Sequence, residues 1–217
     1  MSDVVSRLSV LDACAVSDAL DRLGLPGAVS GFVRWTTTRR ICGRVLTVKM
    51  GKDEGRAPAA RHLGTTAIEA AQPGDVIVME QRTGIDAACW GGNLSLGAKL
   101  RQIAGVIVDG PARDIDEARE YDFPVFARST TTRTARGRIV EAATNVAITV
   151  GDVTVSPGDF VVADASGVVF VAQSDIARVL DAADAVVARE QAMVAALRAG
   201  TPISQVMGTS YETMLKK

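Results

Sequence analysis

Apolar residues recur at helical spacing near both ends of the chain. Near the N-terminus, apolar positions three or four residues apart predict a helix over residues 4–23, and Gly24 and Pro26 are residue types that end a helix. Near the C-terminus, an apolar stripe of the same period predicts one long amphipathic helix over residues 174–199. Both ends of the chain are therefore predicted to be helical.

Short apolar runs alternate with helical segments through the middle of the chain. Strands separated by helices are typical of parallel pairing with crossovers, so we expect a parallel sheet between residues 41 and 126. After residue 139, close-set strands with turn residues between them predict antiparallel pairing. No linker interrupts the chain, so we predict a single α/β domain over residues 1–217. The predicted strands are 41–50, 76–79, 106–108, 125–126, 139–142, 147–150, 160–162 and 168–171, and the predicted helices between them are 57–71, 91–102 and 115–120.

The charge balance argues against two classes of partner. Lys and Arg number 24 and Asp and Glu number 25, so the chain lacks the sustained positive field that binds nucleic acid or an anionic membrane. Its basic cluster, Arg133, Arg136 and Arg138, fits a solvated loop. No apolar run is long enough to span a bilayer, and the N-terminus lacks the pattern of a secretory signal. We expect a cytoplasmic protein with no nucleic-acid or membrane partner.

Isolated reactive side chains favour structural interpretations. Cys14, Cys42 and Cys89 form neither a disulfide framework nor a Cys-x-x-Cys pair, which predicts reduced thiols and no structural zinc. The single histidine, His62, lies in a predicted helix, where a structural hydrogen-bonding role is commoner than a proton shuttle. Glu117 stands at the start of another predicted helix, where we expect a solvated acidic side chain.

The loop after the predicted strand 106–108 carries the sharpest chemical signal. In open α/β sheets, ligands gather beyond the carboxyl ends of strands, and this strand end leads into Arg113 and Asp114. An arginine offers a planar fork for a carboxylate or enolate oxygen. An adjacent aspartate offers a hard oxygen ligand for Mg²⁺ or Mn²⁺. The alternative is that Asp114 caps the next helix and Arg113 is a surface charge.

A second signal is a pair of glycines, Gly91 and Gly92, ahead of a predicted helix. Unpaired backbone N–H groups at a helix start form an anion site. No Lys-Ser/Thr ending follows, so the segment is not a nucleotide-binding phosphate loop. The alternative is that the glycines open the helix for steric reasons alone.

These two segments, together with others in the same order, resemble the RraA-like family. That family includes the 4-hydroxy-4-methyl-2-oxoglutarate aldolases and the regulator of ribonuclease activity A. The resemblance covers nearly the whole chain, and the Arg113-Asp114 pair in its strand-loop setting is its most specific part. The matching segments are 16–20, 62–75, 91–94, 105–110, 113–117, 124–127 and 157–171.

The resemblance implies a single swivelling-type β/β/α sandwich with N-terminal helices and a long C-terminal helix, assembled as a homotrimer or homohexamer. It implies that Asp114 ligates a divalent metal, Mg²⁺ or Mn²⁺, and that Arg113 contacts a small 2-oxo acid. It also implies that Glu190, from the C-terminal helix of a neighbouring subunit, completes the outer metal shell. The implied substrate-binding residues are Gly91, Gly92, Asn93, Leu94, Ser95 and Arg113, with the amides of Leu94 and Ser95 holding the substrate.

One position departs from the pattern of the aldolases. They carry an acid after a glycine ahead of the Arg-Asp pair, where this chain has Gly92 or, allowing a one-residue deletion, Asn93. An Asn side chain can bond a water molecule but cannot accept its proton as Asp can. Asp86, nearby in the sequence, is a candidate replacement.

The function that the resemblance implies is that of a class II, metal-dependent pyruvate aldolase. Such a lyase cleaves a C–C bond of a 2-oxo acid by retro-aldol cleavage, by decarboxylation of oxaloacetate, or both, and each reaction passes through a pyruvate enolate. The alternative is a non-catalytic regulator that binds a ribonuclease or another protein partner. The altered position at Gly92 and Asn93 favours that alternative.

Overall fold

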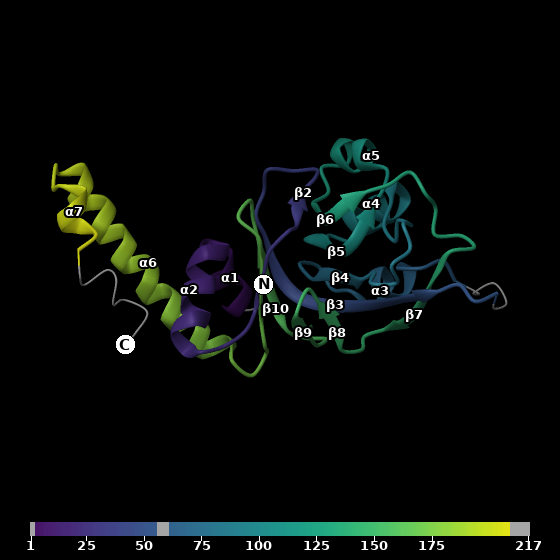
Figure 1. Cartoon of the computed structure of the whole chain (residues 1–217), viewed down its shortest axis with the longest axis horizontal. Coiled ribbons are helices and arrows are strands. Elements are labelled where there is room, and N and C mark those ends of the chain that lie inside the picture. The colour runs from purple at the N-terminus through teal and green to yellow at the C-terminus, as the bar shows by residue number, and fades with distance from the viewer. Residues whose placement is uncertain (1–2, 56–60, 209–217) are drawn as a thin grey trace.

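A parallel sheet forms the centre of the molecule, as the alternating pattern predicts. The computed structural model describes residues 3–55 and 61–208 (Figure 1). Four strands pair in parallel in the order β3-β4-β5-β6. They are β3 (Ile41–Lys52), β4 (Val76–Glu80), β5 (Gly105–Ala112) and β6 (Val125–Thr130), and the helices between them in sequence are α3 (Thr65–Ala70), α4 (Gly92–Leu100) and α5 (Ile115–Glu120).

Antiparallel strands extend this sheet, because β3 is long enough to pair with three neighbours. Its first half pairs with β10, and its second half pairs with β4 on one side and β7 on the other. The antiparallel pairing predicted after residue 139 is therefore confirmed. The added strands are β1 (Ala28–Val29) and β10 (Phe160–Ala163), which both pair with β11 (Val168–Val171), β2 (Val33–Arg34), which pairs with β6, β7 (Ile139–Thr144), and the separate hairpin of β8 (Ile148–Val150) and β9 (Val153–Val155).

The alternation of side chains along the central strands divides the interior into two cores. In β4, Ile77 and Met79 pack in the core that includes α3, α4 and α5. Val76 and Val78 point to the opposite face and pack with the β8–β9 hairpin. All four side chains are fully buried. The helices thus cover one face of the sheet and the hairpin covers the other, which confirms the predicted α/β class and β/β/α sandwich.

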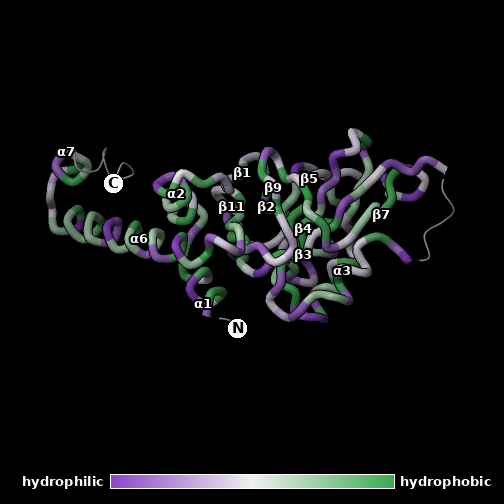
Figure 2. The backbone as a smooth tube through the Cα atoms, turned by 90° about the horizontal axis from the view of Figure 1, so that it is seen from below, coloured by the Kyte–Doolittle hydropathy of each residue, from purple (hydrophilic) through white to green (hydrophobic). Residues whose placement is uncertain are grey.

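Helices from both ends of the chain form a third core against β10 and β11. These helices are α1 (Asp3–Val10), α2 (Ala13–Leu23) and the first half of α6 (Ile176–Arg198). The last buried residue of α6 is Val186. Beyond it, α6 extends away from the body and leads into α7 (Ile203–Val206), as Figures 1 and 2 both show. We call residues 188–206 the arm.

The N-terminal helix is divided where the sequence predicts continuity. The helix expected over residues 4–23 is interrupted after Val10, because the Asp12 side chain accepts a hydrogen bond from the Ala15 N–H at 2.7 Å and caps α2. Aspartate competes with the helical backbone in this way and so favours caps over helix interiors. The predicted end is confirmed, since Gly24 terminates α2 in the left-handed conformation.

The helix expected over residues 57–71 begins only at Thr65. Gly64 precedes it with φ of 79°, a left-handed conformation that a continuous helix does not contain. Residues 57–60 of that prediction lie outside the described residues. Short elements were also missed: β1, β2, β9 and α7 have two to four residues each, too few for a hydrophobic period to be visible.

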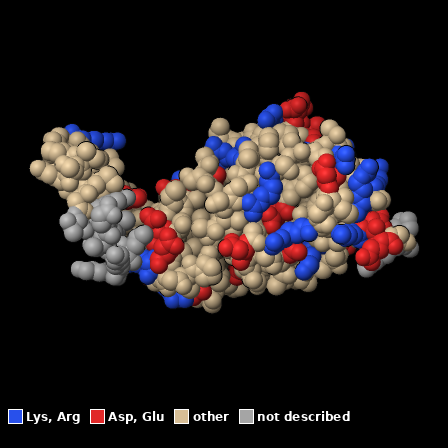
Figure 3. Space-filling view, viewed as in Figure 1, with Lys and Arg blue, Asp and Glu red and all other residues tan. Residues whose placement is uncertain are grey.

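The surface of the described residues is mixed in charge. On the face in Figure 3, Lys and Arg side chains are interspersed with Asp and Glu over the body, and the arm is mostly uncharged. No helix within residues 3–55 and 61–208 combines the length and apolar character that a membrane crossing needs. The second half of α6 exposes apolar side chains, among them Val194 and Leu197.

We expect Leu180→Ala to lower the free energy of unfolding by about 2–5 kcal/mol, because it leaves a cavity under α6 in the third core. Leu180 is 1% exposed, whereas Leu100, at the end of α4, is 74% exposed. Leu100→Ala is the matched control and should change stability by less than about 0.5 kcal/mol. Urea unfolding of the two variants measures both values, and equal losses would contradict the assignment of this core.

Candidate functional site

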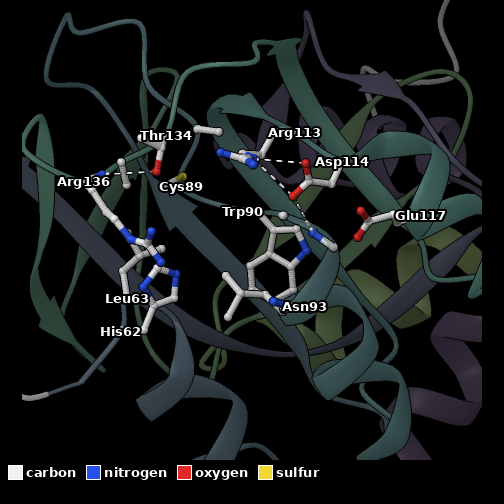
Figure 4. Close-up of a pocket in the computed structure, with 15 residues that line it drawn as sticks. His62, Leu63, Cys89, Trp90, Asn93, Arg113, Asp114, Glu117, Thr134 and Arg136 are labelled. Carbon is white, nitrogen blue, oxygen red and sulfur yellow. Dashed lines mark hydrogen bonds and ion pairs between the residues drawn. The ribbon is translucent and has the colours of Figure 1, made fainter.

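A cavity of about 610 Å³ opens beyond the carboxyl end of β5, where the sequence predicts a ligand site. Its walls come from four segments that are distant in sequence. They are the turn before α3, the stretch leading into α4, the loop from β5 into α5, and the loop before β7. Figure 4 shows Arg113, Asp114 and Glu117 along one side of this space, and His62 and Arg136 on the other.

Two backbone hydrogen bonds fix the end of β5 against the segment that leads into α4. The Cys89 N–H donates to the Pro111 carbonyl at 3.3 Å, and the Arg113 N–H donates to the Trp90 carbonyl at 3.0 Å. The Trp90 ring stacks on Phe123, with 6.1 Å between ring centroids, and is almost fully buried. The loop that carries Arg113 is therefore held directly over the start of α4.

Asp114 occupies the N-cap position of α5 but does not cap it, so the capping alternative is wrong. Its backbone is left-handed, with φ of 56° and ψ of 43°, and its side chain makes no capping hydrogen bond. Instead its Oδ2 accepts from the Gly92 N–H at 3.1 Å, and both carboxylate oxygens accept from the Arg113 Nε, at 3.1 and 3.2 Å. Aspartate is among the few residues that tolerate this conformation, at a cost of about 1–2 kcal/mol.

Gly91 and Gly92 make room for two carboxylates. A Cβ atom on Gly91 would lie 2.7 Å from Asp114 Oδ2, and a Cβ atom on Gly92 would overlap with Glu117 Oε2. The steric interpretation of these glycines therefore holds in a specific form, since both acidic side chains rest on the backbone of the helix start. A longer side chain at residue 92 would meet the Glu117 carboxylate.

The start of α4 offers backbone donors toward the cavity. The N–H groups of Asn93 and Leu94 have no hydrogen-bond partner in the part of the chain that the structure describes. Ser95 is placed differently from the prediction: its N–H already donates to the Gly91 carbonyl at 3.0 Å, within the helix. Its hydroxyl accepts from Trp90 Nε1 at 2.9 Å. Ser95 thus holds the Trp90 ring in place through its hydroxyl group, and the unpaired backbone N–H groups are those of Asn93 and Leu94.

The cavity also includes residues that the sequence patterns assigned to the solvated surface or the core. Glu117 and Arg136 line it, and both residues are exposed, as predicted for a solvated helix start and a solvated loop. His62 lines it from the turn before α3. Burial raises the pKa of the Cys89 thiol to about 12, which leaves it un-ionised at neutral pH and supports its assignment to packing. For Glu117, the i, i+3 spacing from Asp114 was the signal available in the sequence.

Asp86 is not among the lining residues of this cavity, so it is a poor replacement for the acid that the resemblance leads us to expect. It forms an ion pair with Arg133 at 3.5 Å, between two exposed side chains. The carboxylate nearest to residue 92 is that of Glu117. The candidate position of Asp86 is therefore wrong, and the acid that lies over residue 92 is Glu117.

The cavity offers few protein ligands for a metal ion, which fits an ion that takes most of its ligands from water and substrate. Within residues 3–55 and 61–208, no group of three or more His, Cys, Asp or Glu side chains is arranged to hold a metal ion. Mg²⁺ is commonly held by only one or two carboxylates, with water and substrate oxygens as its other ligands. The Asp114 side chain, 30% exposed at the cavity wall, is a hard oxygen donor of this kind.

Glu190 lies on the arm and does not line the cavity of its own chain. Partial burial and then the negative charges of Asp12 and Asp18 raise the pKa of its carboxyl group. A contribution of Glu190 to the site therefore requires a second copy of the chain. Its placement on a helix that extends from the body is compatible with that requirement (Figure 1).

Known proteins resemble this chain over most of its length. Protein DlpA of Legionella pneumophila is 25% identical over 205 residues, which are 94% of this chain but 33% of that protein, so the chain spans about a third of that relative. A Halalkalibacterium halodurans protein named "Putative 4-hydroxy-4-methyl-2-oxoglutarate aldolase" is 33% identical over 186 residues, 83% of this chain and 82% of that protein. The crystal structure of Streptomyces coelicolor RraAS2, described as an unusual member of the RNase ES inhibitor RraA protein family, superposes with a TM-score of 0.78 at 26% identity, covering 88% of this chain and 95% of that one.

The family comparison agrees with the segments that the sequence singled out. The family model described as RraA-like, Aldolase/RraA, matches residues 13–170. This span contains the cavity walls, the glycine pair and the Arg113-Asp114 loop. Because the match covers well over half of the chain, the protein belongs to the RraA-like family.

Proposed function

We propose that this protein is a divalent-metal-dependent lyase that cleaves a C–C bond of a small 2-oxo acid. The observation that carries the proposal is the arrangement around Asp114. One cavity joins a hard oxygen ligand, the guanidinium of Arg113 and the two open amides of Asn93 and Leu94. Several relatives carry the name "Putative 4-hydroxy-4-methyl-2-oxoglutarate aldolase", which supports the same reaction class.

Each group has a role that its surroundings allow. The Asn93 and Leu94 amides and the positive end of the α4 dipole would bind the substrate carboxylate. Arg113 uses its Nε on Asp114 and keeps its terminal nitrogens for the keto oxygen, which gains negative charge as the C–C bond breaks. A Mg²⁺ or Mn²⁺ ion held by Asp114 would supply Lewis-acid stabilisation of that charge. The same groups would stabilise the pyruvate enolate from retro-aldol cleavage and from oxaloacetate decarboxylation.

A homotrimer or homohexamer is part of this proposal. The arm exposes apolar side chains, with Val194 44%, Ile203 57% and Met207 41% exposed, although Met207 lies one residue past it. Exposed apolar side chains on a projecting helix are typical of contacts between subunits. In such an assembly, Glu190 of a neighbouring subunit would reach the metal shell.

A second candidate is a non-catalytic regulator that binds a ribonuclease or another protein. It is favoured by the likeness to RraAS2, whose title places it in the RNase ES inhibitor RraA family. It is also favoured by the absence of an acid at Gly92 and Asn93. The presence of Glu117 over Gly92 weakens this second argument, because a carboxylate is still present at that wall of the cavity.

We expect metal-dependent pyruvate release from 4-hydroxy-4-methyl-2-oxoglutarate or oxaloacetate with Mg²⁺ or Mn²⁺, and none above the metal-only background with EDTA. Asp114→Asn should abolish the activity and the binding of Mn²⁺, followed by electron paramagnetic resonance, because the amide is a weaker metal ligand. Asn tolerates the left-handed backbone, so the fold should be retained. Asp86→Asn is the control of equal charge change. No pyruvate from either substrate would favour the regulator.

We expect Arg113→Lys to lower kcat by about 10²–10³-fold, because an ammonium group lacks the fork that contacts Asp114 and the developing oxyanion together. Mn²⁺ binding should change far less, since Asp114 remains. Steady-state kinetics beside an Mn²⁺ titration separate the two effects. A rate close to that of the unaltered protein would remove Arg113 from the mechanism.

We expect light scattering to give the mass of a trimer or hexamer, and Glu190→Gln to reduce activity without changing that mass. Mixing Glu190→Gln with Asp114→Asn should restore part of the activity, because some sites would combine an intact Asp114 with a neighbour's intact Glu190. A monomer that is fully active would overturn the proposed role of the arm.

A further inference from the structure

Glu117 is the cavity carboxylate that the chemistry above leaves without a role. Among the described residues that line the cavity, Asp114 and Glu117 are the two acids. Asp114 accepts hydrogen bonds from Arg113 and Gly92. The Glu117 carboxylate has no hydrogen-bond or ion-pair partner within residues 3–55 and 61–208, and Figure 4 shows it beside Asp114, on the far side from Arg113. The two acids therefore differ in their surroundings although they share a wall.

The position of Glu117 is set by the glycine below it. Its carboxylate rests over Gly92, where any side chain on residue 92 would displace it. The φ angle of Gly92 is not positive, so the backbone itself does not require a glycine there. The Glu117 carboxylate thus occupies the space that a Cβ atom on residue 92 would take. The first turn of α5 brings Glu117 to the same side as Asp114, three residues earlier.

The two acids suit different tasks. Asp114 already accepts hydrogen bonds from the Gly92 amide and the Arg113 guanidinium, and its hard oxygen atoms suit a metal ligand. Glu117 has no such donors, so its oxygen atoms remain open to a substrate hydroxyl. Assignment of separate roles to two carboxylates through their environments is a general feature of acid–base sites.

We propose that Glu117 is the acid–base group of retro-aldol cleavage, an inference that rests on the lyase function proposed above. Glu117 accepts the proton of the 4-hydroxyl group as the C3–C4 bond breaks. The electrons of the O–H bond form the new carbonyl at C4, and those of the C3–C4 bond pass into the pyruvate enolate. The carboxylic acid then returns the proton to C3, which gives pyruvate and restores the carboxylate, so that no net proton or electron is consumed.

This assignment separates the two reactions of the site. Retro-aldol cleavage cannot begin without a proton acceptor for the 4-hydroxyl group. Decarboxylation of oxaloacetate releases CO₂ without removal of a proton, and its enolate can take a proton from water. Loss of Glu117 should therefore impair one reaction and spare the C–C cleavage of the other.

The test is Glu117→Gln, assayed by pyruvate release from 4-hydroxy-4-methyl-2-oxoglutarate and by consumption of oxaloacetate, each corrected for the metal-only background. We expect the retro-aldol kcat to fall by about 10²–10⁴-fold, the usual contribution of general acid–base catalysis. Oxaloacetate consumption and the dissociation constants of Mn²⁺ and oxalate should stay within a few-fold. Asp116→Asn is the matched control: it is on the same helix with the same charge change, and it pairs with Arg119 at 2.7 Å rather than lining the cavity.

Moving the carboxylate tests its position. Glu117→Ala empties the space over Gly92. Adding Gly92→Asp to this variant should restore part of the retro-aldol rate, because the new carboxylate enters the same space from α4 instead of α5. Gly92→Asp alone should be impaired, because the new side chain meets Glu117. Rescue in the double variant combined with impairment in the single one would not arise if Glu117 only stabilised the fold.

Every other outcome is decisive. Equal loss of both reactions in Glu117→Gln, with weaker Mn²⁺ binding, would make Glu117 a metal or structural residue and overturn the proposal. Unchanged retro-aldol cleavage would also overturn it, and its loss in His62→Asn instead would assign the proton to His62 on the opposite wall. If the unaltered protein cleaves neither substrate and binds no oxalate, the lyase function itself fails, which is distinguishable from failure of Glu117 alone.

Discussion

The contact between the end of β5 and the start of α4 determines the whole site. Two backbone hydrogen bonds, from Cys89 to Pro111 and from Arg113 to Trp90, hold these segments together. Because α4 follows β4 and the Arg113 loop follows β5, the contact depends on parallel pairing of these two strands. The glycines at 91 and 92 then let the loop approach closely enough for its acids to rest on the helix backbone.

The larger features of this arrangement could be predicted from hydrophobic spacing. The parallel pairing of β3 to β6 follows from apolar runs that alternate with helices, and the position of the cavity follows from the general place of ligand sites beyond strand ends. The division at Asp12 could not be seen in that spacing, because one side-chain cap outweighed a continuous apolar stripe. Elements of two to four residues, such as β1 and α7, are too short to show a period at all.

The residue types of the candidate site could be predicted from the sequence, but the orientations of their side chains could not. Arg113 and Asp114 could be identified as a chemical pair, yet the capping alternative failed only because Asp114 adopts a left-handed backbone, which no sequence period reports. Glu117 lies in an ordinary acidic helix start, and its position in the cavity depends on the absence of a side chain at Gly92. Ser95 illustrates the reverse case, since a residue in the right segment has its amide already occupied.

This chain has Gly92 or Asn93 where the aldolases carry an acid, and the position of Glu117 offers a physical explanation for that departure. A side chain at 92 and the present position of Glu117 exclude each other, because both need the same space. The space directly over residue 92 therefore holds one side chain, which comes either from residue 92 of α4 or from Glu117 of α5. In this chain residue 92 is a glycine, and the carboxylate over it comes from Glu117 of α5. Absence of an acid from α4 is thus weak evidence against catalysis, as long as Glu117 is present.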